Sequence, residues 1–246
     1  MKAIILAAGI GKRLGNVSDD KPKCLLEFDG LSLLHRHLQA LENLAVDELV
    51  IVSGYREADL IAEIKRYSGN LPVTTVFNPD FESGSVVSLR RAYSTLESGV
   101  DVLLMDADVL YHPDILQRLV NSKHDNCFLL DRNFEDGDEP VKICVYNNQM
   151  IEFRKIPEAN LSFDFQGESV GFFKFSAEVA HALSDRCLYY IENNRANEPY
   201  EETLRDLLLD KPESFHYEDI SGLAWIEIDF PEDIKRASTD ILNRIK

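Results

Sequence analysis

The chain has 246 residues, with 26 basic against 43 acidic side chains, a formal net charge of −17 and 45% hydrophobic residues. This length fits one α/β domain or two small ones, and the hydrophobic content supports a sizeable core, which excludes wholesale disorder. No apolar run approaches the ~20 residues of a membrane span, and so acidic a chain should repel nucleic-acid backbones. We therefore expect a cytoplasmic protein that binds neither membranes nor nucleic acid.

The start of the chain departs from this acidic balance. Residues 1–23 carry five basic side chains and two acidic ones, namely Lys2, Lys12, Arg13, Lys21 and Lys23 against Asp19 and Asp20. A local cationic segment in an anionic protein suggests a site for a small anion, although chance explains the charge alone equally well.

The four cysteines show neither CxxC spacing nor a nearby histidine cluster. They are Cys24, Cys127, Cys144 and Cys187. This scatter favours reduced thiols in a cytosolic protein over a disulfide framework or a zinc site.

Strand and helix patterns alternate along the first 125 residues. Apolar runs predict strands over residues 2–6, 48–52, 73–77 and 100–105. Apolar residues at helical spacing predict helices over residues 32–44, 57–67 and 85–97. Repeated strand–helix units with continuously apolar strands predict a largely parallel sheet with helices on both faces.

The pattern changes after about residue 125. Four strand-like runs, separated only by turns and loops, span residues 127–130, 141–146, 150–153 and 169–175. Asn147-Asn148 is a plausible hairpin turn between the second and the third. Helices are expected over 177–193, over 200–209 and from Pro231, with a strand over 224–228. We therefore predict a single Rossmann-like α/β domain over residues 1–246, whose β-rich insertion lies over the ends of the parallel strands.

The loop after the first strand reads LAAGIGKRL over residues 6–14. Small residues and glycines let backbone N–H groups approach a ligand closely, as in phosphate-binding loops. A dinucleotide fingerprint would need glycine or alanine at Leu14 and an acidic residue near Ser53, and a P-loop would need serine or threonine at Arg13. Both motifs fit badly. What remains is a glycine loop with two cations that suits a triphosphate, with ordinary turn chemistry as the alternative.

A second motif follows closely, Lys21-Pro22-Lys23. Pro22 has a fixed φ and favours an extended conformation for the residue before it, so Lys23 lies on a stiff segment. A preorganised ammonium beside a phosphate is what phosphoryl and nucleotidyl transfer needs. Alone, the motif would be an ordinary surface turn, but the preceding loop makes it more specific.

These motifs resemble a known family. LAAGIGKRL followed by PKCL over 22–25 is similar to the nucleotidyltransferases that activate sugar 1-phosphates and phospho-alcohols. The resemblance extends over nearly the whole chain, through LLMDAD over 103–108, VGFF over 170–173 and WIEID over 225–229. The layout most resembles the cytidylyltransferase branch, which includes phosphocholine, aminoethylphosphonate and inositol-phosphate enzymes.

Pairs of acidic residues end two of the predicted strands. Asp106 and Asp108 share one face of the first, and Glu227 and Asp229 repeat the pattern in the last. Carboxylates at strand ends suit Mg²⁺, which prefers oxygen ligands. The resemblance implies that Asp108 and Asp229 bind the metal. Because Ala107 stands where many relatives have glycine, Asp106 remains an alternative first ligand.

The resemblance also assigns roles around a nucleotide, and it makes residues 1–125 the nucleotide-binding half. Lys12 and Arg13 would hold the β- and γ-phosphates, and Lys23 would stabilise charge at the α-phosphate. Lys23 and Arg13 are the candidate catalytic residues. The candidate nucleotide-binding residues are Leu6, Ala7, Ala8, Gly9, Gly11, Lys12, Arg13, Lys23, Asn78, Ser83, Gly84, Ser85 and Asp106.

The acceptor is expected in the second half, residues 126–246. The candidates for its site are Arg132, Lys142, Glu168, Tyr200, Glu201, Trp225 and Glu227. Arg132 and Lys142 would hold a phosphate or phosphonate, while the acids and aromatic rings suit a cationic head group. The acidic run over 135–139 is as readily a solvated loop.

The resemblance implies Mg²⁺-dependent transfer of CMP from CTP to a phospho-alcohol or phosphonate, with release of pyrophosphate. Phosphocholine or 2-aminoethylphosphonate is favoured, and inositol phosphate is a further candidate. A sugar-1-phosphate nucleotidyltransferase that uses UTP or dTTP is the nearest alternative. A non-catalytic nucleotide sensor and a Rossmann oxidoreductase are alternatives of other classes. Neither the acceptor nor the oligomeric state follows from the sequence.

Overall fold

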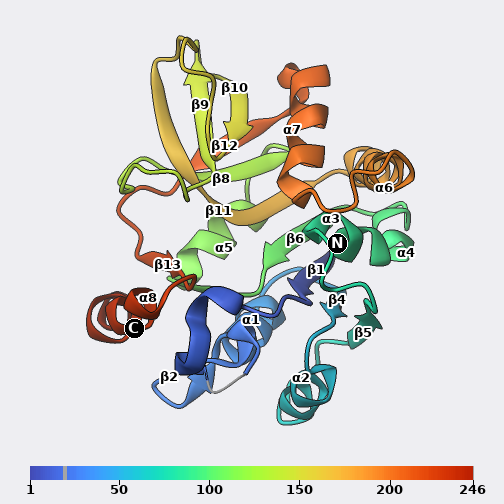
Figure 1. Cartoon of the computed structure of the whole chain (residues 1–246), viewed down its shortest axis with the longest axis vertical. Helices are drawn as coiled ribbons and strands as arrows, with labels where there is room; N and C mark the ends of the chain where they lie inside the picture. The colour runs from blue at the N-terminus through green and yellow to red at the C-terminus, as the bar shows by residue number, and fades with distance from the viewer. Residues whose placement is uncertain (19–20, 246) are drawn as a thin grey trace.

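The computed structural model of the protein describes residues 1–18 and 21–245, and Asp19 and Asp20 of the cationic segment lie outside them. A central sheet runs through the molecule in the order β10-β9-β11-β6-β1-β4-β5, with β8 paired to β11 and β12 (Figure 1). Its parallel part consists of β1 (Lys2–Ala7), β4 (Glu48–Ser53), β5 (Val73–Phe77) and β6 (Val102–Asp106). The predicted parallel core is therefore confirmed.

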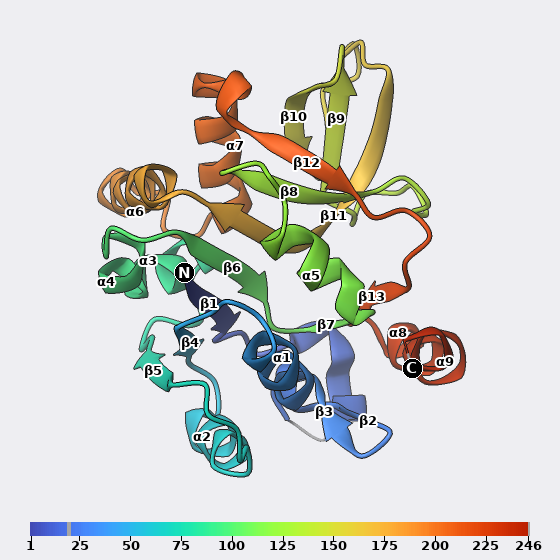
Figure 2. The same ribbon diagram turned by 180° about the vertical axis from the view of Figure 1, so that it is seen from behind.

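Helices cover both faces of this sheet. On one face lie α1 (Leu33–Glu42), α2 (Glu57–Ile64) and α5 (Pro113–Val120); on the other lie α3 (Ser85–Arg91), α4 (Tyr93–Leu96), α6 (Ala177–Glu192) and α7 (Tyr200–Asp210). Figure 2 shows α1 and α5 in front of the sheet and α6 behind it. Along β1, Ile4 packs in one core while Ala3 and Ile5 pack in the other. Because both faces of β1, β4 and β6 are buried, these strands are largely apolar.

The β-rich part contains β8 (Cys127–Asp131), β9 (Lys142–Tyr146), β10 (Gln149–Arg154) and β11 (Phe165–Phe175). Asn147 and Asn148 form the predicted hairpin turn with φ of 49° and 62°, the conformation that a two-residue primed turn requires. The long β11 pairs with β9 near its start and with β6 near its end, so it joins the insertion to the parallel sheet. It begins four residues before the predicted strand, within a polar stretch that carries no clear alternation.

Several short elements were not predicted. They are the hairpin strands β2 (Glu27–Phe28) and β3 (Leu31–Ser32), β7 (Val109–Tyr111), the helix α5 and the polar edge strand β12 (His216–Asp219). The predicted helix over 85–97 is divided into α3 and α4. The described helices include none that is long and apolar enough to cross a membrane.

The last strand brings distant acids together. β13 (Trp225–Glu227) pairs antiparallel with β7, so that Glu227 lies opposite Val109. The backbone N–H of Ile228 donates to the carbonyl of Asp108 at 3.0 Å. The C-terminal helices α8 (Pro231–Arg236) and α9 (Leu242–Arg244), which a π-helical segment joins, follow directly.

Candidate active site

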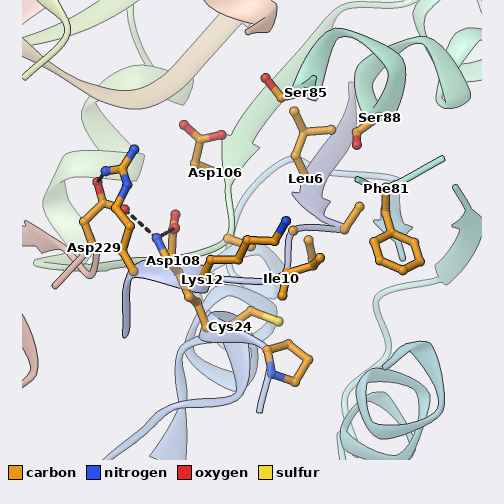
Figure 3. A pocket seen from close by; sticks show the side chains of 18 of the residues that line it. Leu6, Ile10, Lys12, Cys24, Phe81, Ser85, Ser88, Asp106, Asp108 and Asp229 are labelled. Carbon is orange, nitrogen blue, oxygen red and sulfur yellow. Dashed lines mark hydrogen bonds and ion pairs between the residues drawn. The ribbon is translucent and has the colours of Figure 1, made fainter. Parts of the chain in front are cut away.

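A cavity of about 460 Å³ opens at the carboxyl ends of β1 and β6, where open α/β sheets bind ligands. The glycine loop forms one side, and the start of α3 and the segment before it form another (Figure 3). The structure brings together here, from the predicted set, Leu6, Ala7, Ala8, Gly9, Gly11, Lys12, Arg13, Lys23, Ser83, Ser85, Asp106, Asp108, Tyr200, Glu201, Glu227 and Asp229.

Two residues that were predicted to bind the nucleotide, Asn78 and Gly84, do not line this cavity. Asn78 is fully buried, and its amide donates to the Ser88 hydroxyl at 3.0 Å. Gly84 packs against the chain before α7, where a Cβ would lie 2.2 Å from the carbonyl oxygen of Glu198. Both residues therefore position α3, and Ser88 and Phe81, which were not predicted, line the cavity.

Lys23 lies between two of the predicted metal ligands. Its Nζ is 2.9 Å from Oδ2 of Asp108 and 2.5 Å from Oδ1 of Asp229. Burial opposes the charge on the ammonium, but the two carboxylates outweigh it and raise the pKa of Lys23 above its ordinary value. The same attraction, with that of Arg13, holds the pKa of Asp229 below its usual range despite burial.

Local backbone geometry places this lysine. Pro22, with φ −53° and ψ 140°, precedes a short 3₁₀ helix over Lys23–Leu25. Gly11 has φ +70°, and a Cβ there would lie 2.9 Å from Cγ of Lys23. Glycine is thus required both by the turn and by the approach of the lysine.

Asp108, Glu227 and Asp229 form a group that can hold a metal ion. One carboxylate oxygen from each lies within 4.8 Å of the others. Three hard oxygen donors, two of which belong to side chains that contact the Lys23 ammonium, fit a divalent cation such as Mg²⁺. Burial, together with the two aspartates, raises the pKa of Glu227.

Asp106 has a different environment from Asp108. Its Oδ2 accepts a hydrogen bond from the Tyr200 hydroxyl at 2.8 Å. Burial and the nearby carboxylates of Glu201 and Asp108 raise its pKa. The structure therefore separates the two candidates for the first ligand and groups Asp108 with Glu227 and Asp229.

Cations of the glycine loop and of the β-rich part meet at Glu139. Nη1 of Arg13 lies 2.9 Å from Oδ2 of Asp229 and 3.0 Å from Oε2 of Glu139. The same Oε2 lies 3.1 Å from Nζ of Lys155, which follows β10. Lys155 was not predicted, because one lysine just beyond a strand gives no signal in the sequence.

A second cavity, of about 270 Å³, adjoins the first through Glu227 and Asp229. Of the predicted acceptor residues it contains Glu168, Trp225 and Glu227, the last of which it shares with the first cavity. The Trp225 indole N–H donates to Oδ2 of Asp131 at 2.8 Å. Burial and the neighbouring Asp131 raise the pKa of Glu168 to about 7.

The two predicted acceptor cations lie elsewhere. The Arg132 guanidinium carbon lies 4.3 Å from the ring centre of Phe165. Lys142 is 6% exposed and donates to the backbone carbonyls of Gly137 and Lys155. Neither lines the two cavities above. A buried ammonium is stabilised by such carbonyl bonds, so Lys142 holds the loop before β9 to the segment after β10.

Comparison with known proteins identifies the family of this chain. The family model of the MobA-like NTP transferase domain matches residues 3–196. The chain belongs to this family. It is a nucleotidyltransferase, and the match includes the glycine loop, Lys23 and Asp108.

Named relatives of this nucleotidyltransferase differ in substrate. The chain is 28% identical to the CTP:phosphoglutamine cytidylyltransferase of Campylobacter jejuni, over 96% of this chain and 98% of that protein. It is 28% identical to the UTP–glucose-1-phosphate uridylyltransferase of Haloferax volcanii, over 95% and 93% of the two chains. In fold it is similar to the inositol-1-phosphate CTP transferase from T. maritima, with a TM-score of 0.78 at 22% identity over 100% of this chain and 96% of that one.

Proposed function

We propose that this nucleotidyltransferase moves CMP from CTP to a phospho-alcohol or phosphonate that carries a cationic group, with Mg²⁺ as the metal. The observation that carries the proposal is the junction of the two cavities at Glu227 and Asp229. One cavity has the glycine loop and its cations. The other has the carboxylates of Asp131 and Glu168 and the indole of Trp225. Two substrates in these cavities would meet beside Lys23 and the group of three acids.

In the proposed reaction, an oxygen of the acceptor's phosphate or phosphonate attacks the α-phosphorus of CTP. A new P–O bond forms, the bond from the α-phosphorus to the bridging oxygen breaks, and pyrophosphate leaves with that electron pair. The nucleophile is already anionic near neutral pH, because the second pKa of a phosphate is about 6. No catalytic base is needed, so the protein acts by alignment and charge neutralisation.

Three cations of this chain would bind the reacting phosphates. Lys12 and Arg13, which line the cavity from the glycine loop, would bind the β- and γ-phosphates, and Lys23 would bind the α-phosphate. Mg²⁺ held by Asp108, Glu227 and Asp229 would supply positive charge between the two anionic substrates.

Lys155 is proposed for the acceptor's phosphate. It lies on the β-rich side and shares Glu139 with Arg13, so its ammonium is next to the nucleotide cations. The carboxylates of Glu168 and Asp131 beside Trp225 suit an ammonium group. The guanidinium of Arg236 lies in the same cavity and attracts Glu168; a cationic head group would add a counter-charge that a neutral polyol lacks, which favours phosphocholine or 2-aminoethylphosphonate over inositol phosphate.

A panel of nucleoside triphosphates and acceptors tests the proposal, with pyrophosphate release as the readout. We expect release with CTP, a divalent cation and an amine-bearing acceptor, and none when one of the three is omitted. The Haloferax volcanii relative makes UTP with glucose 1-phosphate the second candidate. Release with that pair, and not with CTP, would replace the proposed substrates.

A further inference from the structure

The proposed metal ligand Asp108 lies in a short bend between two strands. β6 ends two residues before it, and β7 begins at the residue after it. The backbone carbonyl of Asp108 accepts from the N–H of Ile228 at 3.0 Å. The preceding residue, Ala107, is buried, and its carbonyl oxygen lies 3.2 Å from Nε2 of His37 on α1. Because a buried carbonyl needs a hydrogen-bond donor, the imidazole of His37 holds one side of this bend.

The direction of the hydrogen bonds around His37 follows from its partners. The side chain is fully buried, and burial lowers the pKa of His37 to about 4, so the ring is neutral at pH 7 and carries one proton. The carbonyl of Ala107 can only accept, so this proton lies on Nε2. Nδ1 then has a lone pair, and the hydroxyl of Tyr111, 3.3 Å away, donates to it. Tyr111 therefore orients the histidine, and the histidine donates to Ala107.

Aromatic packing keeps the imidazole in this orientation. The rings of His37 and Tyr111 are stacked, with centroids 5.4 Å apart and planes at 27°. Phe172 meets both rings edge-on, at centroid distances of 6.0 Å and 4.9 Å. Phe172 belongs to the VGFF segment over residues 170–173, which the proposed reaction does not use. This segment thus packs against the side chains that hold the bend before Asp108.

We infer that His37 is a positioning residue for the metal site: through the carbonyl of Ala107 it sets the direction of the Asp108 carboxylate. The inference rests on the proposed metal site. Rotation of the peptide between Ala107 and Asp108 would change the direction in which the aspartate side chain leaves the backbone. Functional groups must be held to within about 0.5 Å of their productive positions, so this rotation would weaken the metal site. His37 does not line the active-site cavity, and it acts through one backbone hydrogen bond.

Binding of Mn²⁺ to the nucleotide-free protein tests the inference without turnover. Each variant is combined with Lys23→Met, which removes the ammonium from the carboxylates, and free Mn²⁺ is titrated by electron paramagnetic resonance. We expect His37→Leu, which has no donor, to bind Mn²⁺ about tenfold more weakly than the Lys23→Met parent. His37→Gln keeps an N–H that can reach the Ala107 carbonyl, so we expect its affinity to stay within about threefold of the parent.

A matched control separates positioning from general stability. Ser184 on α6 is also fully buried, and its hydroxyl bonds with Arg90 and Glu97, away from the bend. We expect Ser184→Ala to leave Mn²⁺ affinity unchanged even where its melting temperature falls as far as that of His37→Leu.

Tyr111→Phe is a milder variant that keeps the packed ring and removes only the hydroxyl, so it tests the same bonds if His37→Leu does not fold. We expect Mn²⁺ to bind about threefold more weakly in Tyr111→Phe, with no further effect when His37 is already leucine. Nitrogen NMR of the imidazole in the otherwise unchanged protein gives a second readout. We expect a protonated Nε2 and an unprotonated Nδ1 in His37, and the reverse pattern would overturn the inference.

The outcomes separate this inference from the proposed function. Mn²⁺ affinity within about twofold of the parent in folded His37→Leu would overturn the inference, as would His37→Gln or Ser184→Ala weakened as much as His37→Leu. These results leave CMP transfer intact. Failure of the Lys23→Met parent to bind Mn²⁺ would remove the metal site and the inference with it. Weakened binding in His37→Leu that glutamine restores, in a protein that transfers CMP to no acceptor, would support the inference and overturn the proposed function.

Discussion

The ammonium of Lys23 lies 2.5 Å from Oδ1 of Asp229, and no motif in the sequence shows this contact. Asp108 contacts the same ammonium at 2.9 Å, so the lysine occupies the space between the acids that are proposed to hold the metal. A divalent cation and the ammonium cannot both take this position. We therefore expect the Lys23 ammonium to leave these carboxylates when a metal ion binds them.

Removal of the lysine is expected to impair turnover but not folding. Loss of one preorganised donor to the transition state typically costs roughly 10²–10³ in rate. We predict a fall of this size in kcat for Lys23→Ala, measured by pyrophosphate release. Lys21→Ala is the matched control, because Lys21 is exposed and two residues away, and it should keep wild-type activity. Near-normal turnover in Lys23→Ala would remove the lysine from the mechanism.

The contact of Lys23 with the two aspartates also predicts that removal of the lysine strengthens metal binding. Lys23→Met leaves the carboxylates of Asp108 and Asp229 without their counter-ion, so Mn²⁺ should bind more tightly to the nucleotide-free protein. We expect a gain of about tenfold or more, since a buried ion pair broken on one side leaves an uncompensated charge. Titration of free Mn²⁺ by electron paramagnetic resonance measures it. Unchanged or weaker binding would show that the lysine and the metal do not share a position.

Lys155 is predicted to act on the acceptor and not on the nucleotide. Lys155→Ala should raise KM for the acceptor by about tenfold or more, because a charge-assisted hydrogen bond to the phosphate is lost, with little change in KM for CTP. Steady-state kinetics with each substrate varied in turn separate the two values. Lys65→Ala, which removes an exposed lysine next to α2, serves as the control. An equal rise in both KM values would contradict the assignment.

Glu168 predicts a pH dependence for a cationic acceptor. Since its pKa is raised to about 7, the carboxyl is mostly neutral at pH 6 and mostly ionised at pH 8. KM for the acceptor should therefore fall by roughly tenfold across this range from Glu168 alone. Glu168→Gln retains the titration of the substrate's own phosphate, so the difference between the two pH profiles isolates this group. Superimposable profiles would exclude Glu168 from the acceptor site.

Patterns within short stretches of the sequence predicted the strands and the turn that depend mainly on neighbouring residues. Apolar runs identified β1, β4 and β6, β-branched and aromatic residues identified β5, and the Asn147-Asn148 turn followed from the tolerance of asparagine for positive φ. The strand β12 was missed, because its residues are polar and it pairs in parallel at the edge of the sheet. Pairing of this kind depends on a distant strand and leaves no periodic signal.

In the candidate site, too, the sequence predicted what depends on neighbouring residues and missed what depends on distant ones. Lys23 and the glycine loop were identified because their chemistry and spacing are contiguous in the chain. Glu227 was paired with Asp229 on the last strand but assigned to the acceptor, and its register opposite Val109 places it near Asp108. The division into a nucleotide-binding half and an acceptor-binding half stays a prediction.

The most direct test of the account is the mass of the product. The protein is incubated with CTP, Mg²⁺ and an equimolar mixture of phosphocholine, 2-aminoethylphosphonate, inositol 1-phosphate and glucose 1-phosphate, and the products are identified by mass spectrometry. We predict a CMP conjugate of an amine-bearing acceptor together with pyrophosphate. A conjugate of a neutral acceptor alone, or no conjugate with CTP when UTP gives one, would contradict it.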